Sequence, residues 1–235
     1  MSPGTSASFV EDRSKASSLI RPLLVLISAP SGGGKTTLCD QLIAVRADMT
    51  RAVTCTTRPP RPGEREGIDY YFLSADAFHK RVEAGDFLEH ATVHGHSYGT
   101  LQSEVREKMN LGKDVLLNLD VQGAATIRAK AQRDPDLKAA LVSVFLTPLS
   151  ITVLEARLRK RGTDSEAVIQ KRLNAARHEI EHWKDFDYLI VSESIGDDLR
   201  RMQLILDAEK MKSTRVQGPD FDAETGKALC PNQGT

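Results

Sequence analysis

Cysteine is scarce in this sequence of 235 residues, which contains three: Cys39, Cys55 and Cys230. Their spacing does not suit a metal site, and an odd number of scattered cysteines does not suit a disulfide-stapled scaffold. We therefore expect a reducing compartment.

Net charge is absent as well, because 32 Lys and Arg residues balance 32 Asp and Glu residues. This balance argues against a general polyanion binder, so we expect no nucleic-acid partner, and any phosphate recognition must be local. Long apolar runs are also missing: residues 1–21 contain no stretch that suits a signal peptide or a membrane span. We expect a cytoplasmic protein with no membrane partner, and the sequence gives no indication of its oligomeric state.

What the sequence does contain is an alternation of two patterns. Unbroken apolar runs of strand length suit strands that are buried on both faces of a parallel sheet. These runs are Pro22–Ser28, Arg51–Cys55, Val115–Leu119, Leu141–Leu146 and Tyr188–Val191. Helical patterns lie between them, at Lys35–Val45, Gly123–Ala131, Ile151–Lys160, Ser165–His182 and Asp197–Lys212. Strands that alternate with helices predict an α/β fold.

Three parts of the chain depart from this alternation. Residues 1–20 are polar and Ser-rich, and residues 213–235 lose apolar periodicity, so we predict two flexible extensions around one domain at residues 21–212. The stretch from about residue 54 to 110 is interpreted as an inserted subdomain. It contains a Pro, Gly and Arg-rich loop at Arg58–Gly67, an aromatic strand at Tyr70–Phe72 and a hairpin-like segment around Gly95.

A candidate phosphate-binding loop follows the first predicted strand and opens the first predicted helix. Its residues are Ala29, Pro30, Ser31, Gly32, Gly33, Gly34, Lys35, Thr36 and Thr37. In this context the backbone N–H groups of the glycines surround phosphate oxygens, Lys35 bridges the β- and γ-phosphates, and the Thr36 hydroxyl ligates Mg²⁺. The sequence therefore predicts a site for a nucleoside triphosphate.

Asp120 ends the apolar run that begins at Val115. A strand beside the phosphate-loop strand commonly delivers an acidic group near the metal, either directly or through water. Asp is also a favoured capping residue for a helix that follows. Both interpretations of Asp120 remain open.

Further motifs, in order along the chain, make the sequence resemble guanylate kinase. They are Ser28–Thr36, Thr56–Glu64, Asp69–Phe72, Phe87–Glu89, Tyr98–Thr100, Leu119–Gly123, Arg161–Thr163 and Lys171–Leu173. The resemblance spans about residues 22 to 210. It implies a P-loop kinase with a parallel-sheet core flanked by helices, a GMP-binding subdomain at about residues 54–110, and a helical lid at about residues 147–172. The implied activity, part of purine nucleotide metabolism, transfers the γ-phosphoryl group of ATP to GMP and uses Mg²⁺.

The resemblance also implies residue roles. GMP would be bound by Thr54, Arg58, Arg61, Tyr70, Glu89, Tyr98, Thr100 and Asp120. The catalytic groups would be Lys35, Arg58, Asp120 and the lid arginines Arg157, Arg161 and Arg172. These residue types suit the proposed ligands. A planar guanidinium group can donate two parallel hydrogen bonds to two oxygens of one phosphate. A carboxylate such as Glu89 can accept from both N1–H and the amino group of guanine.

The sequence departs from the family pattern at two positions. Asn118 stands where some relatives carry an acid, and Ser192 stands where many have an Asn near the adenine. Three histidines, His90, His94 and His96, lie close together in the sequence around Gly95. They lack a Cys or acidic partner, so we predict no metal site there.

Two other functions share part of this sequence pattern. A guanylate-kinase-like scaffold that binds phosphorylated proteins could dispense with Lys35 and Thr36, which are present. A different small kinase, such as ribose 1,5-bisphosphate phosphokinase, need not read guanine. Glu89, together with Thr54 and Thr100, favours GMP over that alternative.

Overall fold

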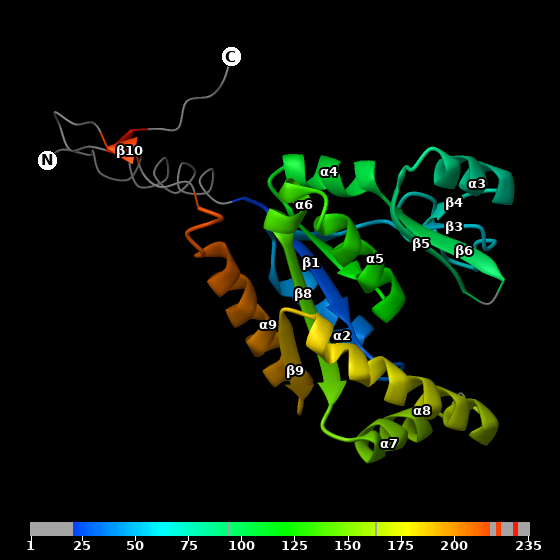
Figure 1. Ribbon diagram of the computed structural model, residues 1–235. Coiled ribbons are helices and arrows are strands. Elements are labelled where there is room, and N and C mark those ends of the chain that lie inside the picture. Colours follow the sequence, from blue (N-terminus) through cyan, green and yellow to red (C-terminus); the bar gives the residue numbers. More distant parts are fainter. Residues whose placement is uncertain (1–20, 94, 163, 217–219, 222–227, 230–235) are drawn as a thin grey trace, which may run out of the picture. The chain divides into compact units, whose positions relative to one another are not determined.

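The structure is a computed structural model that describes residues 21–93, 95–162, 164–216, 220–221 and 228–229 (Figure 1). Residues 22–204 form one compact unit, and a second unit comprises residues 1–21 and 205–235. Within the described part of the chain, no helix is long and apolar enough to cross a membrane.

Five parallel strands form the central sheet of the larger unit, as far as the structure describes it, in the order β2–β7–β1–β8–β9. Their bounds are Leu24–Ser28 (β1), Met49–Arg51 (β2), Asp114–Asn118 (β7), Leu141–Pro148 (β8) and Tyr188–Ser192 (β9). Leu26 of β1 lies opposite Leu117 on one side and Ser143 on the other, and every residue of β1 is buried. This central position explains why the β1 sequence is continuously apolar.

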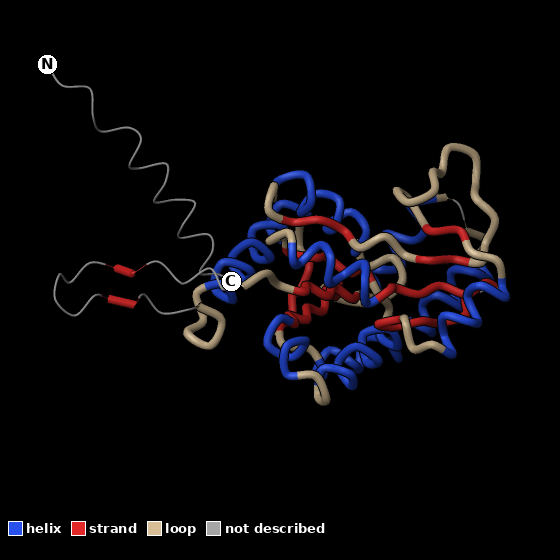
Figure 2. The backbone as a smooth tube through the Cα atoms, turned by 90° about the horizontal axis from the view of Figure 1, so that it is seen from above, coloured by secondary structure: helices blue, strands red, loops and turns tan. Residues whose placement is uncertain are grey.

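Helices flank the central sheet (Figure 2). They are α2 (Lys35–Val45), α5 (Val121–Ala131), α6 (Pro135–Ala140), α7 (Ile151–Arg161), α8 (Glu166–Glu181), the 3₁₀ helix η1 (His182–Asp185) and α9 (Ile195–Lys210). Ala124 and Ile127 of α5 pack in one core cluster with Leu26 and Leu117 of the sheet. Helices α7 and α8 share a separate cluster, formed by Leu154, Leu158, Ile169, Leu173 and Ala176.

The segment predicted as an insertion contains a second sheet, in the strand order β4–β3–β6–β5. Its elements are β3 (Cys55–Thr56), β4 (Tyr71–Phe72), α3 (Ala75–Glu83), β5 (Phe87–Val93), β6 (His96–Leu101) and α4 (Gln102–Asn110). Strands β5 and β6 form an antiparallel hairpin, and Gly95 between them has a φ of 79°. Cys55, Phe78 and Phe87 form a small core for this sheet, which lies with α3 at one end of the unit in Figure 1.

The α/β prediction is confirmed, but the predicted strand Arg51–Cys55 is wrong. The chain leaves the central sheet after Arg51, which lies opposite Leu116, and enters the second sheet at Cys55, which lies opposite Gly99. Between them, Val53 donates its backbone N–H to the buried Glu104 carboxylate at 2.8 Å. Apolar composition alone does not indicate to which sheet a short run belongs.

In the smaller unit, Asp220–Phe221 (β10) pairs in antiparallel fashion with Ala228–Leu229 (β11). The Glu209 carboxylate near the end of α9 forms an ion pair with Arg215 at 2.9 Å. Both features fall partly within the tail predicted at residues 213–235. The N-terminal extension predicted at residues 1–20 lies outside the described residues, and the flexibility of both ends stays a prediction.

Candidate active site

The phosphate-binding loop connects the buried strand β1 to the N-terminus of α2. Gly32 and Gly34 have φ angles of 86° and 97°, which side-chain-bearing residues rarely adopt. Gly33 donates its N–H to the Pro30 carbonyl at 2.8 Å, which closes the turn. Gly34 is the N-cap of α2 and offers no side chain to cap it. The loop therefore directs free helix N–H groups and positive dipole charge toward a bound anion.

The predicted residues Ala29–Thr37 line a cavity of about 280 Å³, together with Asp120 and Glu179. Lys35 is one of these lining residues and donates from Nζ to the Leu119 carbonyl at 2.8 Å. Burial lowers the pKa of Lys35, and the nearby charges of Asp120 and Glu179 oppose that effect. The cavity thus combines a cation, backbone donors and two carboxylates.

The structure confirms Asp120 as a helix cap, and its role near a metal ion stays a prediction. Its Oδ1 accepts the backbone N–H of Gly123 at 2.8 Å, so it is the N-cap of α5. The same residue lines the phosphate-loop cavity. A single carboxylate therefore starts a core helix and faces the position where phosphates would lie.

Glu89 and Thr100 lie opposite each other on β5 and β6. Both are buried, and the Thr100 hydroxyl donates to Glu89 Oε1 at 2.8 Å. Burial raises the pKa of Glu89; the Thr100 hydrogen bond opposes the rise and the negative charge of Asp120 adds to it. A Cβ placed on Gly123 would lie 3.4 Å from Glu89 Oε2, so the first turn of α5 is close to this carboxylate. Thr54 precedes β3, and its carbonyl accepts from the Tyr71 N–H at 3.0 Å.

Arg58 lies among the other residues predicted to hold the GMP phosphate. Its guanidinium donates to both oxygens of Glu64, at 2.8 and 2.9 Å, and lies 5.4 Å from the centre of the Tyr70 ring. The hydrogen bond raises the pKa of Arg58 and lowers that of Glu64. Tyr98 is 6.3 Å from Tyr70, ring centre to ring centre. Arg61 is exposed and donates its backbone N–H to Glu64 at 2.7 Å.

The lid arginines have separate partners. Arg157 on α7 donates to the Ser192 hydroxyl at 3.2 Å, and Arg172 on α8 forms an ion pair with Asp164 at 3.2 Å. The side chain of Arg161 and all of Thr163 lie outside the description. Convergence of these arginines on the phosphate loop stays a prediction.

A family model described as guanylate kinase matches residues 21–209 of the chain. The chain belongs to the guanylate kinase family. The guanylate kinase of Maricaulis maris is 43% identical over 195 residues, which are 83% of this chain and 87% of that protein. The guanylate kinase of Thermotoga maritima is 41% identical over 194 residues, 83% of this chain and 90% of that protein. The crystal structure of guanylate kinase from Anaplasma phagocytophilum has a TM-score of 0.65 and 32% identity, and covers 85% of this chain and 92% of that one.

Two residues that line cavities of this guanylate kinase were missed from the sequence. Glu179 on α8 accepts the Ser31 N–H at 3.1 Å, although 148 residues separate them. Asp198 on α9 is buried and accepts from the Ser192 hydroxyl at 2.7 Å. Each lies on a helix where an acid is usually solvated, so no local pattern distinguishes it.

The residues present fit a magnesium ion. Mg²⁺ is usually held by one or two protein oxygens, substrate phosphates and water. Thr36 has an exposed hydroxyl-bearing side chain, and Asp120 lines the same cavity. No cluster of three or more acidic, His or Cys residues occurs in the described segments. His90 instead lies near Phe78 and Phe87, and His94 is outside the described residues.

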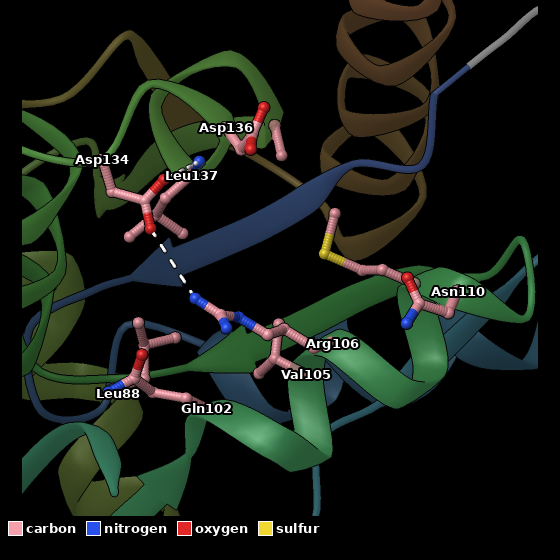
Figure 3. Close-up of a pocket in the computed structure, with 10 residues that line it drawn as sticks. Leu88, Gln102, Val105, Arg106, Asn110, Asp134, Asp136 and Leu137 are labelled. Carbon is pink, nitrogen blue, oxygen red and sulfur yellow. Dashed lines mark hydrogen bonds and ion pairs between the residues drawn. The ribbon is translucent and has the colours of Figure 1, made fainter. Parts of the chain in front are cut away.

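Another cavity, of about 420 Å³, lies between α4 and α6 (Figure 3). Arg106 and Asp134 face each other across it in a weak ion pair of 3.9 Å. Its described lining includes Leu88 and Val105 but none of the predicted site residues. We therefore assign neither substrate to it.

Proposed function

We propose that this guanylate kinase transfers the γ-phosphoryl group of ATP to GMP, giving ADP and GDP, at the cavity beside the phosphate loop. Residues 29–37 would hold the ATP phosphates. The segment at about residues 54–110 would bind GMP, and the lid at about residues 147–172 would close over both nucleotides. The substrates are small molecules, and the reaction belongs to purine nucleotide metabolism.

The position of Asp120 is the observation that carries this proposal. Asp120 lines the phosphate-loop cavity, and a Cβ placed on Gly123 would lie 3.5 Å from Asp120 Oδ1 and 3.4 Å from Glu89 Oε2. The candidate donor site and the candidate guanine site are therefore neighbours across one carboxylate. This arrangement suits a reaction in which two bound nucleotides exchange a phosphoryl group directly.

The acceptor would be recognised at both ends. Glu89 accepts from N1–H and the amino group of guanine, Thr100 keeps one carboxylate oxygen oriented, and Thr54 would add a further contact to the base. At the other end, the phosphate dianion of GMP competes with Glu64 for Arg58, and Arg61, Tyr70 and Tyr98 supply further donors. Exchange of one anion for another keeps Arg58 paired throughout.

The chemical step then depends on alignment and charge. The nucleophile is a GMP phosphate oxygen, which is already largely ionised at neutral pH because the second phosphate pKa is about 6. Lys35 and the arginines at positions 58, 157, 161 and 172 would stabilise the charge of the transferring group, and lid closure would exclude water. Thr36 and, through water, Asp120 would hold Mg²⁺, which neutralises phosphate charge when bound.

We also propose that the protein works in the cytoplasm. Cys39 and Cys55 are both buried and free, and burial raises the pKa of each thiol to about 11, which keeps it protonated and unreactive. Such thiols suit a reducing compartment.

The deciding experiment measures ADP release from ATP with five acceptors: GMP, dGMP, AMP, CMP and ribose 1,5-bisphosphate. We expect rapid release with GMP and very little with AMP. Equal rates with GMP and AMP, or a preference for the sugar bisphosphate, would contradict the proposal.

The variant Lys35→Ala separates an enzyme from a scaffold that only binds. We expect it to fold normally and to lose turnover by about 10² or more, because one charge aimed at the transferring group contributes about 3 kcal/mol. Lys113→Ala is the matched control, since the Lys113 ammonium binds the Ala47 carbonyl on the exposed surface. A soluble Lys35→Ala protein with more than half of the wild-type turnover would refute the assignment.

A further inference from the structure

We propose that Asp198 reads the base of the phosphoryl donor and favours a base with an exocyclic amine, as in adenine, over one with a carbonyl at that position. This inference rests on the proposed function, because it takes the phosphate loop as the site of the donor's phosphates. It goes beyond that function by naming the residue that selects the donor.

A cavity of about 420 Å³ adjoins the phosphate loop. Gly32, Gly34 and Thr37 line both this cavity and the phosphate cavity, so the two spaces share a wall. The rest of its lining consists of Arg157, Lys160, Ser192, Ile195 and Asp198. A nucleotide whose phosphates occupy the loop therefore has room in this cavity for its base.

Asp198 has an unmet hydrogen-bonding capacity at this cavity. The residue is only 2% exposed. Its Oδ2 accepts from the Ser192 hydroxyl at 2.7 Å, whereas its buried Oδ1 has no hydrogen-bond partner among the described residues. A buried carboxylate oxygen without a donor is unfavourable, and few occur in native proteins. A ligand that supplies an N–H would remove the deficit.

The neighbours of Asp198 determine what such a ligand must offer. The Ser192 hydroxyl proton is used by Asp198, and Ser192 Oγ in turn accepts from Arg157 at 3.2 Å. The Ser192 hydroxyl therefore has no proton left for a base, and the unpaired group is an acceptor. Adenine presents a donor through its 6-amino group. A 6-oxo purine in the same orientation presents a second acceptor, which leaves two lone pairs facing each other.

The test compares three phosphoryl donors with GMP as acceptor: ATP, inosine triphosphate and purine riboside triphosphate. Inosine carries oxygen at position 6, and purine riboside carries only hydrogen there. We expect kcat/KM for ATP to exceed that for inosine triphosphate by about 100-fold and that for purine riboside triphosphate by about tenfold, as for a hydrogen bond to a charged group.

The variant Asp198→Asn keeps the size of the side chain but offers an amide that also donates. We expect this variant to lower the ratio of kcat/KM for ATP to kcat/KM for inosine triphosphate by tenfold or more, while the KM for GMP stays unchanged. Asp197→Asn is the matched control, because Asp197 is the neighbouring acid on α9, outside the cavity lining, and accepts from the Ser194 hydroxyl. Its donor ratio should equal that of the wild type.

Any smaller change of the ratio in a folded Asp198→Asn protein overturns the inference. If that variant does not fold, the wild-type comparison decides: equal use of ATP and purine riboside triphosphate overturns the inference, and a tenfold preference for ATP supports it. A wild-type protein that transfers to GMP from every donor alike refutes only the role of Asp198. No transfer from ATP to GMP at all refutes the proposed function itself.

Discussion

Replacing Gly32 with alanine tests how closely the phosphate loop and the lid are packed. Gly32 has a φ of 86°, and an added Cβ would lie 2.8 Å from Leu158 Cδ2 and 3.1 Å from Leu154 Cδ1 on α7. Both leucines are fully buried in the cluster shared by α7 and α8. Their side chains have little room to turn away, so the new methyl group has to displace the helix or the loop.

Two penalties contribute to the expected loss of stability. A side chain at positive φ costs about 1–2 kcal/mol, and overpacking of a filled core costs about 1–3 kcal/mol. For a unit of this size each kcal/mol lowers the melting temperature by about 2–4 °C. A combined loss of about 3 kcal/mol therefore predicts a fall in melting temperature of about 6–12 °C. Displacement of the loop also predicts a rise in the KM for ATP.

The variant Gly112→Ala isolates the backbone term. Gly112 has a φ of 75°, and a Cβ there would meet no described atom within 4 Å. Thermal unfolding followed by circular dichroism should show a smaller loss for this variant than for Gly32→Ala, of about 2–8 °C. If Gly32→Ala melts at the same temperature as Gly112→Ala, then the lid helix does not press on the loop, and the packing argument fails.

Three further predictions concern the substrates and the lid. Burial raises the pKa of Glu89, so the wild-type kcat/KM for GMP should fall as the pH decreases through that pKa and the carboxylate is protonated. Glu89→Gln should lack this pH dependence and should lower kcat/KM for GMP by about 10²–10³. A pH series of kcat/KM on both proteins checks this prediction. Asp120→Asn should keep the melting temperature of the wild type, since Asn caps a helix as well as Asp does, but should reduce turnover more than tenfold. If turnover falls only together with the melting temperature, then Asp120 is only a helix cap. Adding GMP with a non-hydrolysable ATP analogue should draw residues 54–110 and 147–172 toward the core, and X-ray scattering curves that do not change would contradict this closure.

The sequence predicted best what contiguous residues determine. The phosphate loop requires its glycines, Lys35 and a preceding strand within a few positions, so the motif and its context could be read together. The buried β1 was equally clear, because a strand between two others has no solvated face. The segment Arg51–Cys55 was mispredicted, since two short strands of different sheets lie almost end to end in an apolar run.

Residues that come together only through the tertiary fold could not be predicted. Glu179 reaches the phosphate loop from α8 because helix packing places it there, and no spacing in the sequence relates it to Ser31. Asp198 resembles any acid in the first turn of a helix, where it would favour the helix dipole. Asp120 shows a different limit: from the sequence, an acid near the phosphates and a helix cap are alternatives, but one carboxylate caps α5 and also lines the phosphate-loop cavity.

The contact between Glu179 and Ser31 gives the free protein an internal anion in its anion-binding loop. A phosphate oxygen that takes the Ser31 N–H has to displace this carboxylate first. Binding of a triphosphate is then an exchange of ligands rather than the filling of an empty site, and the measured affinity is a difference between two similar interactions. A hydrogen bond to a charged group contributes about 1.5–3 kcal/mol, so release of Glu179 weakens the apparent affinity by up to about 10²-fold. Between turnovers, when no nucleotide is bound, Glu179 keeps the Ser31 N–H hydrogen-bonded.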